Sequence, residues 1–197
     1  GIEMGLDITP IRGKFGWDFK INYTRNRSEV LQIADGVDQV VIAGYSNLGN
    51  IARVGEQYGV IFGSPFVRNE SGALRVDNVG SYVTGSNDDV IGDPNPNFTV
   101  NWINNFSWKG LSFGFQWDYI DGGDIYSSTV QALLARGNTI DTDVDRFLPI
   151  ILPGELADGT PNNIQTYIGD AFFDGYFGAN EGGIFDGTVI RLREVSL

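Results

Sequence analysis

The sequence predicts an all-β fold, in which an antiparallel sheet forms part of a transmembrane β-barrel with long external loops. Apolar and polar residues alternate with a period of two over segments of about ten residues, the length that a tilted strand needs to cross a bilayer. Short and long connections alternate between these segments, as turns and external loops do in outer-membrane barrels. We expect strands near 1–9, 15–24, 98–108, 111–120 and 188–197, with long loops at 25–97 and 121–187, all within a single barrel domain over 1–197.

The first two segments carry the alternation most clearly. In 1–9 and 15–24 every second residue is apolar, and the residues between are polar or glycine. The apolar set is Ile2, Met4, Leu6, Ile8, Phe15, Trp17, Phe19, Ile21 and Tyr23. A short turn around 10–14 joins the two segments with a parity that keeps both apolar sets on one face of the sheet.

The connection between the third and fourth segments predicts their register. Lys109-Gly110 suits a two-residue hairpin turn, in which glycine supplies a positive φ. That turn predicts three apolar cross-strand pairs, namely Trp108–Leu111, Phe106–Phe113 and Trp102–Trp117. A slip of one residue would mix the two faces, so the turn and the alternation agree.

The long connections contain some local structure and most of the charge. Segments 38–43 and 58–62 resemble short strands, and 127–136 predicts a short helix that ends at Gly137. Eleven acidic and two basic residues lie in 121–187, which we interpret as a solvated acidic surface rather than an ion site.

The composition excludes several classes of function. Lys and Arg total 13 against 25 Asp and Glu, and a net charge of −12 repels nucleic-acid phosphates, so nucleic acid is not an expected partner. The chain has no Cys and no His, which removes disulfides, thiolate or imidazole metal sites and His-based triads. The longest apolar runs, such as 40–43, are too short for a transmembrane helix.

No motif predicts catalysis or cofactor binding. Asp141, Asp143 and Asp145 have the spacing of the first half of a Ca²⁺ loop, but Arg146 and Leu152 stand where that loop needs Gly and Glu. Acidic residues are plentiful, and their separations in space do not follow from the sequence, so no catalytic pair can be named. We therefore expect no metal, no cofactor and no enzymatic activity.

The apolar strand face is rich in aromatic residues, many of them near strand ends. The end positions hold Phe15, Trp17, Tyr23, Trp108, Trp117 and Tyr119. Aromatic girdles mark the lipid–water interfaces of membrane barrels, so outer-membrane lipid is an expected partner. The alternative is a secreted soluble β-sandwich that binds carbohydrate, with this face as its core. Since a barrel needs about eight strands to close, we interpret the chain as part of a larger protein.

Several motifs occur in a fixed order along the chain. The most specific is Gly92-Asp93-Pro94-Asn95-Pro96-Asn97-Phe98, which leads into a strand and is followed by Asn105-Phe106-Ser107-Trp108-Lys109-Gly110. Weaker motifs are Gly1-Ile2-Glu3 with Ile8-Thr9-Pro10, Trp17 and Asn26, then Val54-Gly55, Tyr58-Gly59 and Phe62-Gly63, then Gly122–Tyr126 and Ile190–Leu197. Together they resemble the C-terminal barrel half of SusC/RagA-type TonB-dependent outer-membrane transporters.

The resemblance implies a function and a location. Such a transporter has a barrel of about 22 strands with a plugged lumen, of which this chain would be a fraction. The family imports large nutrients, typically glycans or peptides, across the cell outer membrane, with energy from the TonB complex. A SusD-like surface lipoprotein closes the external mouth. The plug and the segment that contacts TonB belong to parts of such proteins that this chain does not contain.

The resemblance also suggests which residues serve transport. Residues of the polar strand face would line the lumen or meet the plug, namely Asp7, Asp18, Lys20, Asn22, Asn101 and Gln116. Loop 121–187, with Gly123, Asp124 and Asn162, would contribute to the external mouth and contact the substrate or the lid partner.

Overall fold

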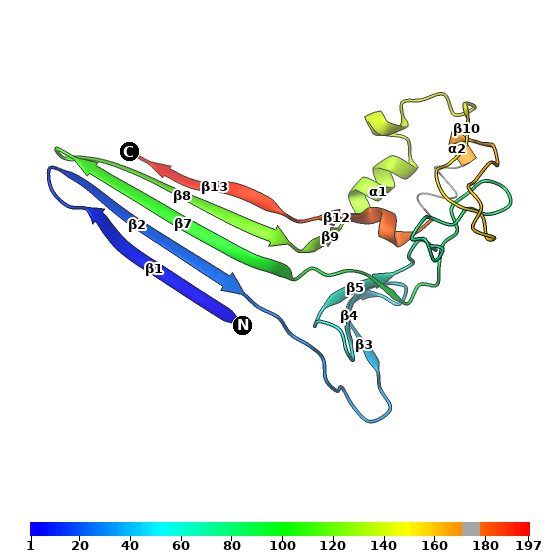
Figure 1. The fold of residues 1–197 in the computed structure, drawn as a ribbon, viewed down its shortest axis with the longest axis horizontal. Coiled ribbons are helices and arrows are strands. Elements are labelled where there is room, and N and C mark those ends of the chain that lie inside the picture. Colours follow the sequence, from blue (N-terminus) through cyan, green and yellow to red (C-terminus); the bar gives the residue numbers. More distant parts are fainter. Residues whose placement is uncertain (171–177) are drawn as a thin grey trace.

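A computed structural model describes residues 1–170 and 178–197. The chain forms one long antiparallel sheet with a cluster of shorter elements at one end (Figure 1). Both tight turns of the sheet lie at the far end, and the strands pass into the long connections at the near end (Figure 1). We call the cluster of shorter elements, residues 26–95 and 123–187, the end region.

The long sheet contains five strands in the order β1-β2-β7-β8-β13. Their bounds are β1 Ile2–Ile11, β2 Phe15–Arg25, β7 Pro96–Trp108, β8 Leu111–Gly122 and β13 Val189–Ser196. Every neighbouring pair is antiparallel, which confirms the all-β antiparallel prediction. Among the described residues, β1 and β13 are the two edges of an open sheet and do not pair with each other. The five strands therefore do not form a closed barrel.

The tight turn between β7 and β8 has the predicted geometry. Lys109 has a φ of 50° and Gly110 a φ of 88°, as a two-residue turn with two left-handed positions requires. The three predicted pairs, Trp108–Leu111, Phe106–Phe113 and Trp102–Trp117, are all present. The register read from the turn is therefore confirmed.

A β-bulge in β13 changes the parity of that strand. The pairing with β8 shifts between Leu192 and Glu194, so Arg193 is the additional residue. Because the bulge moves the following residues by one position, Val195 shares a face with Ile190 and Leu192. Simple alternation along this segment would have placed Val195 on the opposite face.

The connection 25–97, which was predicted as a long loop with short strands at 38–43 and 58–62, contains a second sheet of four strands. The order is β3-β4-β5-β6, with bounds β3 Gln39–Tyr45, β4 Leu48–Arg53, β5 Val60–Gly63 and β6 Asp89–Gly92. The strands expected at 38–43 and 58–62 correspond to β3 and β5. The other two carried no strand signal, because β4 mixes glycine, polar and apolar residues and β6 is only four residues long.

The connection 121–187 forms short elements. They are β9 Asp124–Tyr126, α1 Ser128–Ala135, a 3₁₀ helix Ile140–Thr142, β10 Pro149–Ile150, β11 Thr166–Tyr167, α2 Ile168–Asp170, a 3₁₀ helix Asn180–Gly183 and β12 Ile184–Asp186. The predicted helix is α1, and Ser127 caps it by accepting a hydrogen bond from the Val130 backbone N–H at 3.3 Å. Gly137, with a φ of 69°, ends it as expected.

The hydrophobic core lies in the end region and not in the long sheet. One cluster contains Phe66, Val76, Tyr82, Leu152 and Ala179, and a second contains Ile51, Val60 and Phe62. Hydrogen bonds join the two long connections across this core. The Ser64 backbone N–H donates to Asn180 Oδ1 at 3.1 Å, and the Asn180 backbone N–H donates to Ser64 Oγ at 2.9 Å.

Candidate functional site

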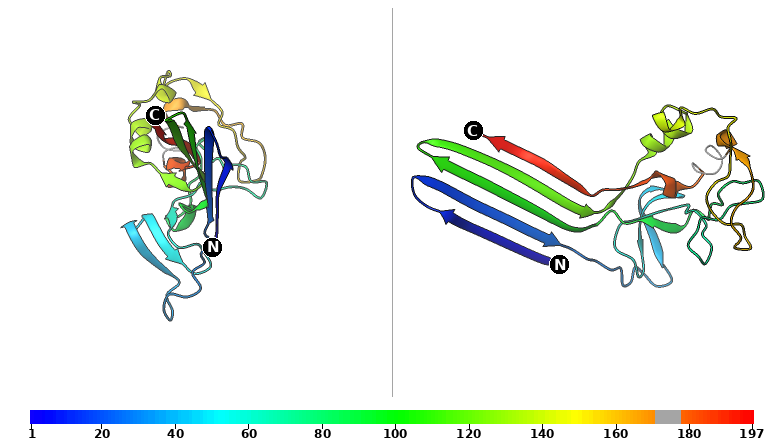
Figure 2. Two further views of the ribbon diagram at one scale, coloured as in Figure 1. Left: turned by 90° about the vertical axis from the view of Figure 1, so that its left-hand side faces the viewer. Right: turned by 45° about the horizontal axis from the view of Figure 1, so that its top comes forward.

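The long sheet has one apolar face that no other described element covers (Figures 1 and 2). The registers of all five strands place most of their apolar residues on this side, whereas Ile103, Ile120 and Val189 lie on the opposite one. The apolar face includes Met4, Leu6, Ile8, Trp17, Phe19, Ile21, Tyr23, Trp102, Phe106, Trp108, Leu111, Phe113, Phe115, Trp117, Tyr119, Ile190, Leu192 and Val195. Its large side chains reach 60% exposure at Met4 and 53% at Trp108.

Aromatic rings stack across the strands of the apolar face. Trp17 and Phe106 are stacked with centroids 5.9 Å apart, and Trp102 and Trp117 are stacked at 6.3 Å. Such pairs contribute about 0.5–1.5 kcal/mol each beyond their burial. The rings therefore stabilise one another within the sheet while their outer surfaces stay uncovered.

Asn104 is the one polar residue in the centre of this face, and it is paired. It is 7% exposed, and its side-chain oxygen accepts a hydrogen bond from Trp17 Nε1 at 3.1 Å. A side-chain amide without a hydrogen-bond partner would cost about 1–3 kcal/mol at this position. The Trp17 indole N–H supplies that partner, so the polar Asn104 can occupy an otherwise apolar row.

The uncovered apolar face argues against a soluble β-sandwich. In a sandwich this face would pack on a second sheet about 10 Å away. The part of the chain that the structure describes supplies no such layer, since its second sheet lies beyond the strand ends (Figure 2). Soluble monomers rarely expose an apolar patch of more than a few hundred Å².

The opposite face is polar and carries all six residues that were expected to line a lumen. Asp7, Lys20 and Gln116 share one cross-strand row, and the Lys20 ammonium lies 2.8 Å from the Asp7 carboxylate. Asn22 and Asn101 are paired in the next row. Asp18 accepts a hydrogen bond from Thr9 Oγ1 at 2.7 Å.

Asp118 and Arg193 are among the charged residues of this face that were not expected as lumen-lining ones. Asp118 accepts a hydrogen bond from Asn101 Nδ2 at 2.5 Å and forms an ion pair with Arg193. Alternation already placed Asp118 on the polar side. The role of Arg193 depends on the β13 bulge, which the sequence does not reveal.

Gly123 and Asp124 hold the junction between the long sheet and the end region. The Asp124 backbone N–H donates to the Asp93 carbonyl, and the Asp93 backbone N–H donates to Asp124 Oδ2, both at 2.7 Å. Gly123 has a φ of 83°, and an added Cβ would lie 3.1 Å from the Pro94 carbonyl oxygen. These contacts place both residues against the segment that begins at Gly92.

Asn162 lies elsewhere in the end region and organises a loop. Its Nδ2 donates to the Leu152 carbonyl at 2.8 Å, and its Oδ1 accepts from the Ile164 backbone N–H at 2.9 Å. The hydrogen bonds of Gly123 and Asp124 are made to other segments, so the three expected loop residues do not form one cluster.

Many acidic residues of the end region stabilise turns. Five aspartates each accept a hydrogen bond from the backbone N–H two residues later, namely Asp77, Asp93, Asp145, Asp158 and Asp186. Hydrogen bonds from the side chain and then the backbone of Thr160 lower the pKa of Asp158. Thr188 lowers the pKa of Asp186 in the same way. This is the turn chemistry that favours aspartate in loops.

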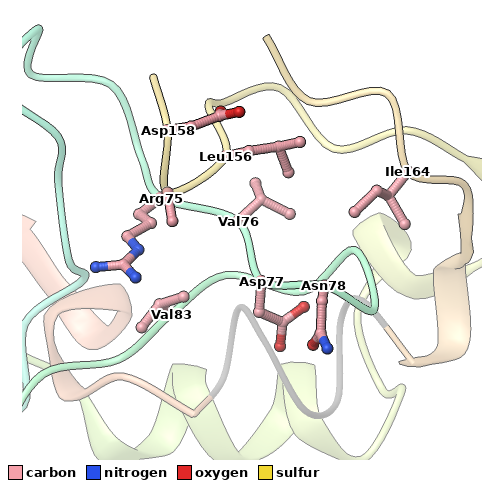
Figure 3. A pocket seen from close by; sticks show the side chains of 9 residues that line it. Arg75, Val76, Asp77, Asn78, Val83, Leu156, Asp158 and Ile164 are labelled. Atoms are coloured by element: carbon pink, nitrogen blue, oxygen red, sulfur yellow. The ribbon is translucent and has the colours of Figure 1, made fainter. Parts of the chain in front are cut away.

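At least three cavities of ligand size, of about 450, 510 and 370 Å³, lie in the end region. The first, of about 450 Å³, is lined by Tyr45, Leu48, Asp124, Ile125 and Tyr126 among others, so it includes one expected site residue. The second, of about 510 Å³, lies between the segment 75–83 and the segment 156–164 (Figure 3). Sites for small ligands typically have volumes of this size. Sequence reasoning found none of these cavities, because each is formed by segments far apart in the chain.

The described ranges, 1–170 and 178–197, contain neither a metal-binding cluster nor a membrane-spanning helix. No group of three or more His, Cys, Asp or Glu side chains in them could hold a metal ion. No helix in them is long and apolar enough to cross a bilayer.

Comparisons with known proteins find similarity among solved structures. No protein-family model matches the sequence, and no curated protein matches it significantly. Among solved structures, the chain is similar to one chain of the RagAB peptide transporter, with a TM-score of 0.57 and 18% sequence identity. The similarity covers 98% of this chain and 22% of that chain. The two share the fold of this segment.

Proposed function

We propose that this chain is part of a SusC/RagA-type TonB-dependent transporter that imports large nutrients, glycans or peptides, across the outer membrane. The observation that carries the proposal is the uncovered aromatic-rich face of five long strands, with a polar face behind it. Only hydrocarbon or another protein layer would remove such a face from water. The fold similarity to part of the RagAB peptide transporter supports the first of these.

The dimensions of the apolar face support contact with a membrane. From Trp108 at the turn end to Val100, level with Tyr23 and Tyr119, strand β7 covers about 26 Å at 3.3 Å per residue. A tilt of about 40° reduces this to about 20 Å, close to the apolar band of about 25 Å in outer-membrane barrels. Aromatic residues lie at both limits, as expected for rings at the two lipid–water interfaces.

The same orientation predicts where the end region lies relative to the membrane. Its core and its acidic surface begin where the long strands end, so it would project beyond the membrane and form part of the external mouth. A SusD-like lipoprotein would cover that mouth, and the polar face would line the lumen. Contact with the TonB complex belongs to other parts of the complete transporter. The proposal assigns no catalytic step to the chain.

Spin labels on the two faces test the orientation. The chain has no native Cys, so single cysteines can be placed at Leu192 on the apolar face and at Glu194 on the polar face of the same strand. In the complete protein reconstituted in bilayers, a label at 192 should be reached by oxygen and not by a water-soluble nickel chelate. The label at 194 is the matched control and should show the opposite preference. Equal access of the chelate to both positions, or a folded monomer without detergent, would refute the membrane orientation.

Uptake tests the transport function separately. Cells that lack the complete protein should lose accumulation of labelled oligosaccharides or peptides, and a plasmid copy should restore it. Unchanged accumulation of every labelled substrate would contradict a role in import even if the protein resides in the membrane.

A further inference from the structure

The two tight turns of the long sheet form a basic end of the molecule. Figures 1 and 2 show the turns next to each other, at the end of the sheet away from the end region. All the charged residues in the stretches 9–15 and 107–112 are basic, namely Arg12, Lys14 and Lys109. The chain as a whole has a net charge of −12, and its second long connection carries eleven acidic residues against two basic ones. The charge is therefore segregated along the sheet, with cations at the turn end and carboxylates at the other.

The strand register places these cations directly beyond the last apolar row of the sheet. Phe15 pairs with Trp108, and Trp108 pairs with Leu111, so these three residues form the final row. Their exposed fractions are 41%, 53% and 57%. Lys14 precedes Phe15 and Lys109 follows Trp108, so the two lysines stand next to each other at the ends of neighbouring strands. The apolar face therefore ends in a border of positive charge.

Lys109 connects this charge to the apolar face itself. Its ammonium nitrogen lies 5.0 Å from the centroid of the Trp108 ring. A cation at this distance is attracted to the face of an indole ring. Because Trp108 belongs to the apolar face, the ammonium lies beside the surface that the proposed function assigns to lipid.

The cations and the apolar row together match the chemistry of an anionic phospholipid. Trp rings sit at the headgroup level of a membrane, so a cation on the Trp108 ring would lie at the depth of the lipid phosphates. Lys and Arg side chains extend their charge from an apolar surface to the interface. Basic segments at a membrane surface attract anionic lipids. Such a lipid offers a negative headgroup to the cations and acyl chains to the apolar row.

We propose that the turn end of the sheet binds the headgroup of an anionic phospholipid, with Lys14 and Lys109 at the phosphate, Arg12 beside them and the acyl chains along the row of Trp108 and Leu111. The inference rests on the proposed function, in which the apolar face meets lipid and the short turns face the periplasm. It adds a lipid selectivity to that orientation. The protein would gather anionic lipid in the leaflet away from its acidic end region.

Quenching of a fluorophore beside the turn measures which lipid gathers there. The complete protein carries Phe113→Cys as its single cysteine, labelled with a nitrobenzoxadiazole fluorophore on the apolar face close to the turn. It is reconstituted in bilayers of equal amounts of phosphatidylglycerol and phosphatidylcholine. A nitroxide quencher is attached near the headgroup end of the acyl chain of one lipid or the other. Phosphatidylglycerol should quench more strongly at low ionic strength, and the difference should shrink in high salt because salt screens the charges.

Charge variants assign the preference to the turns. Lys109→Gln should lower the preference for phosphatidylglycerol about fivefold, the factor that one basic residue contributes at an anionic surface. Replacing Arg12, Lys14 and Lys109 together by Gln should abolish it, whereas Lys109→Arg should keep it. Arg136→Gln is the matched control, because it removes one exposed positive charge at the end of α1 in the end region and should leave the preference unchanged.

The outcomes separate this inference from the proposed function. Equal quenching by the two lipids, or a preference that survives the loss of all three cations, would overturn the lipid site and leave the membrane orientation standing. An equal loss in Arg136→Gln would show an effect of net charge alone and would also overturn the site. Absence of quenching by either lipid would overturn both, because the label would then lie outside the bilayer.

Discussion

Glu181 joins the two long connections, and its replacement is the sharpest test of how the end region is held together. Arg68 Nη2 lies 2.6 Å from Glu181 Oε1, and Arg68 Nη1 lies 3.1 Å from Oε2. The Phe66 backbone N–H also donates to Oε2 at 2.7 Å. These contacts bridge more than 110 residues of chain, as the separations of 113 and 115 show. Glu181→Gln keeps the size of the side chain and removes its charge.

The cost of this change follows from the number of charged hydrogen bonds and from their exposure. Removing the charge from such a bond costs about 1.5–3 kcal/mol when the pair is shielded. The side chains are 44% exposed for Arg68 and 25% for Glu181, so water screens part of the interaction. We therefore expect a loss of about 1–2 kcal/mol of local stability, which corresponds to a factor of about 5–30 in the opening equilibrium.

Hydrogen exchange measures the opening directly. In Glu181→Gln the amide of Phe66 should exchange about 5–30 times faster than in the native chain, since exchange follows local opening. Glu70→Gln is the control, because Glu70 is an exposed acid of the same region, and it should change exchange little. Unchanged protection of the 64–68 segment would show that the Arg68–Glu181 bridge does not hold the two connections together.

The same contact predicts a dependence on pH. Burial raises the pKa of Glu181, but the hydrogen bonds from Arg68 and the Phe66 N–H outweigh it and hold the pKa below its ordinary value of 4.5. A lowered pKa in the folded state means that the stabilisation is present above the unfolded value and is lost as the pH falls through the folded value. The end region should therefore loosen below about pH 4.5, and Glu181→Gln should remove this part of the acid sensitivity, as followed by near-UV circular dichroism.

Three further changes test the sheet and its junction. Asn104→Val leaves the Trp17 indole N–H without an acceptor and should cost about 1–3 kcal/mol in urea unfolding, whereas unchanged stability would mean that this bond is dispensable. Leu192→Arg should impair membrane assembly by about 2–4 kcal/mol, because it places a charge on the face proposed to meet lipid. Glu194→Arg, on the polar face of the same strand, should have little effect. Equal assembly of the two variants would count against the orientation. Gly123→Ala, at a φ of 83°, should lower the melting temperature of the end region through backbone strain, and an unaltered melting temperature would contradict that reasoning.

Local sequence signals determined the architecture of the long sheet. The alternation over 15–24 and 98–119 assigns each side chain to a face, because successive residues of a strand point to opposite sides. The Lys109-Gly110 turn then sets the register of β7 and β8, since its geometry fixes which residues face each other. Both signals involve neighbours in the chain, so no knowledge of distant contacts was needed. The distribution of polar residues such as Asn101 and Gln116 followed from the same parity.

Only the tertiary structure decided the end region and the sites within it. Ser64 meets Asn180 across 116 residues, and Arg75 and Leu156 line one cavity although they are distant in the chain. Contacts of this kind depend on how two long connections fold against each other, and they leave no periodic trace in either segment. The bulge at Arg193 likewise depends on pairing with β8 and not on the residues of β13 alone. The chain's local patterns thus specified its strands and their faces, while packing between distant segments specified where a ligand could bind.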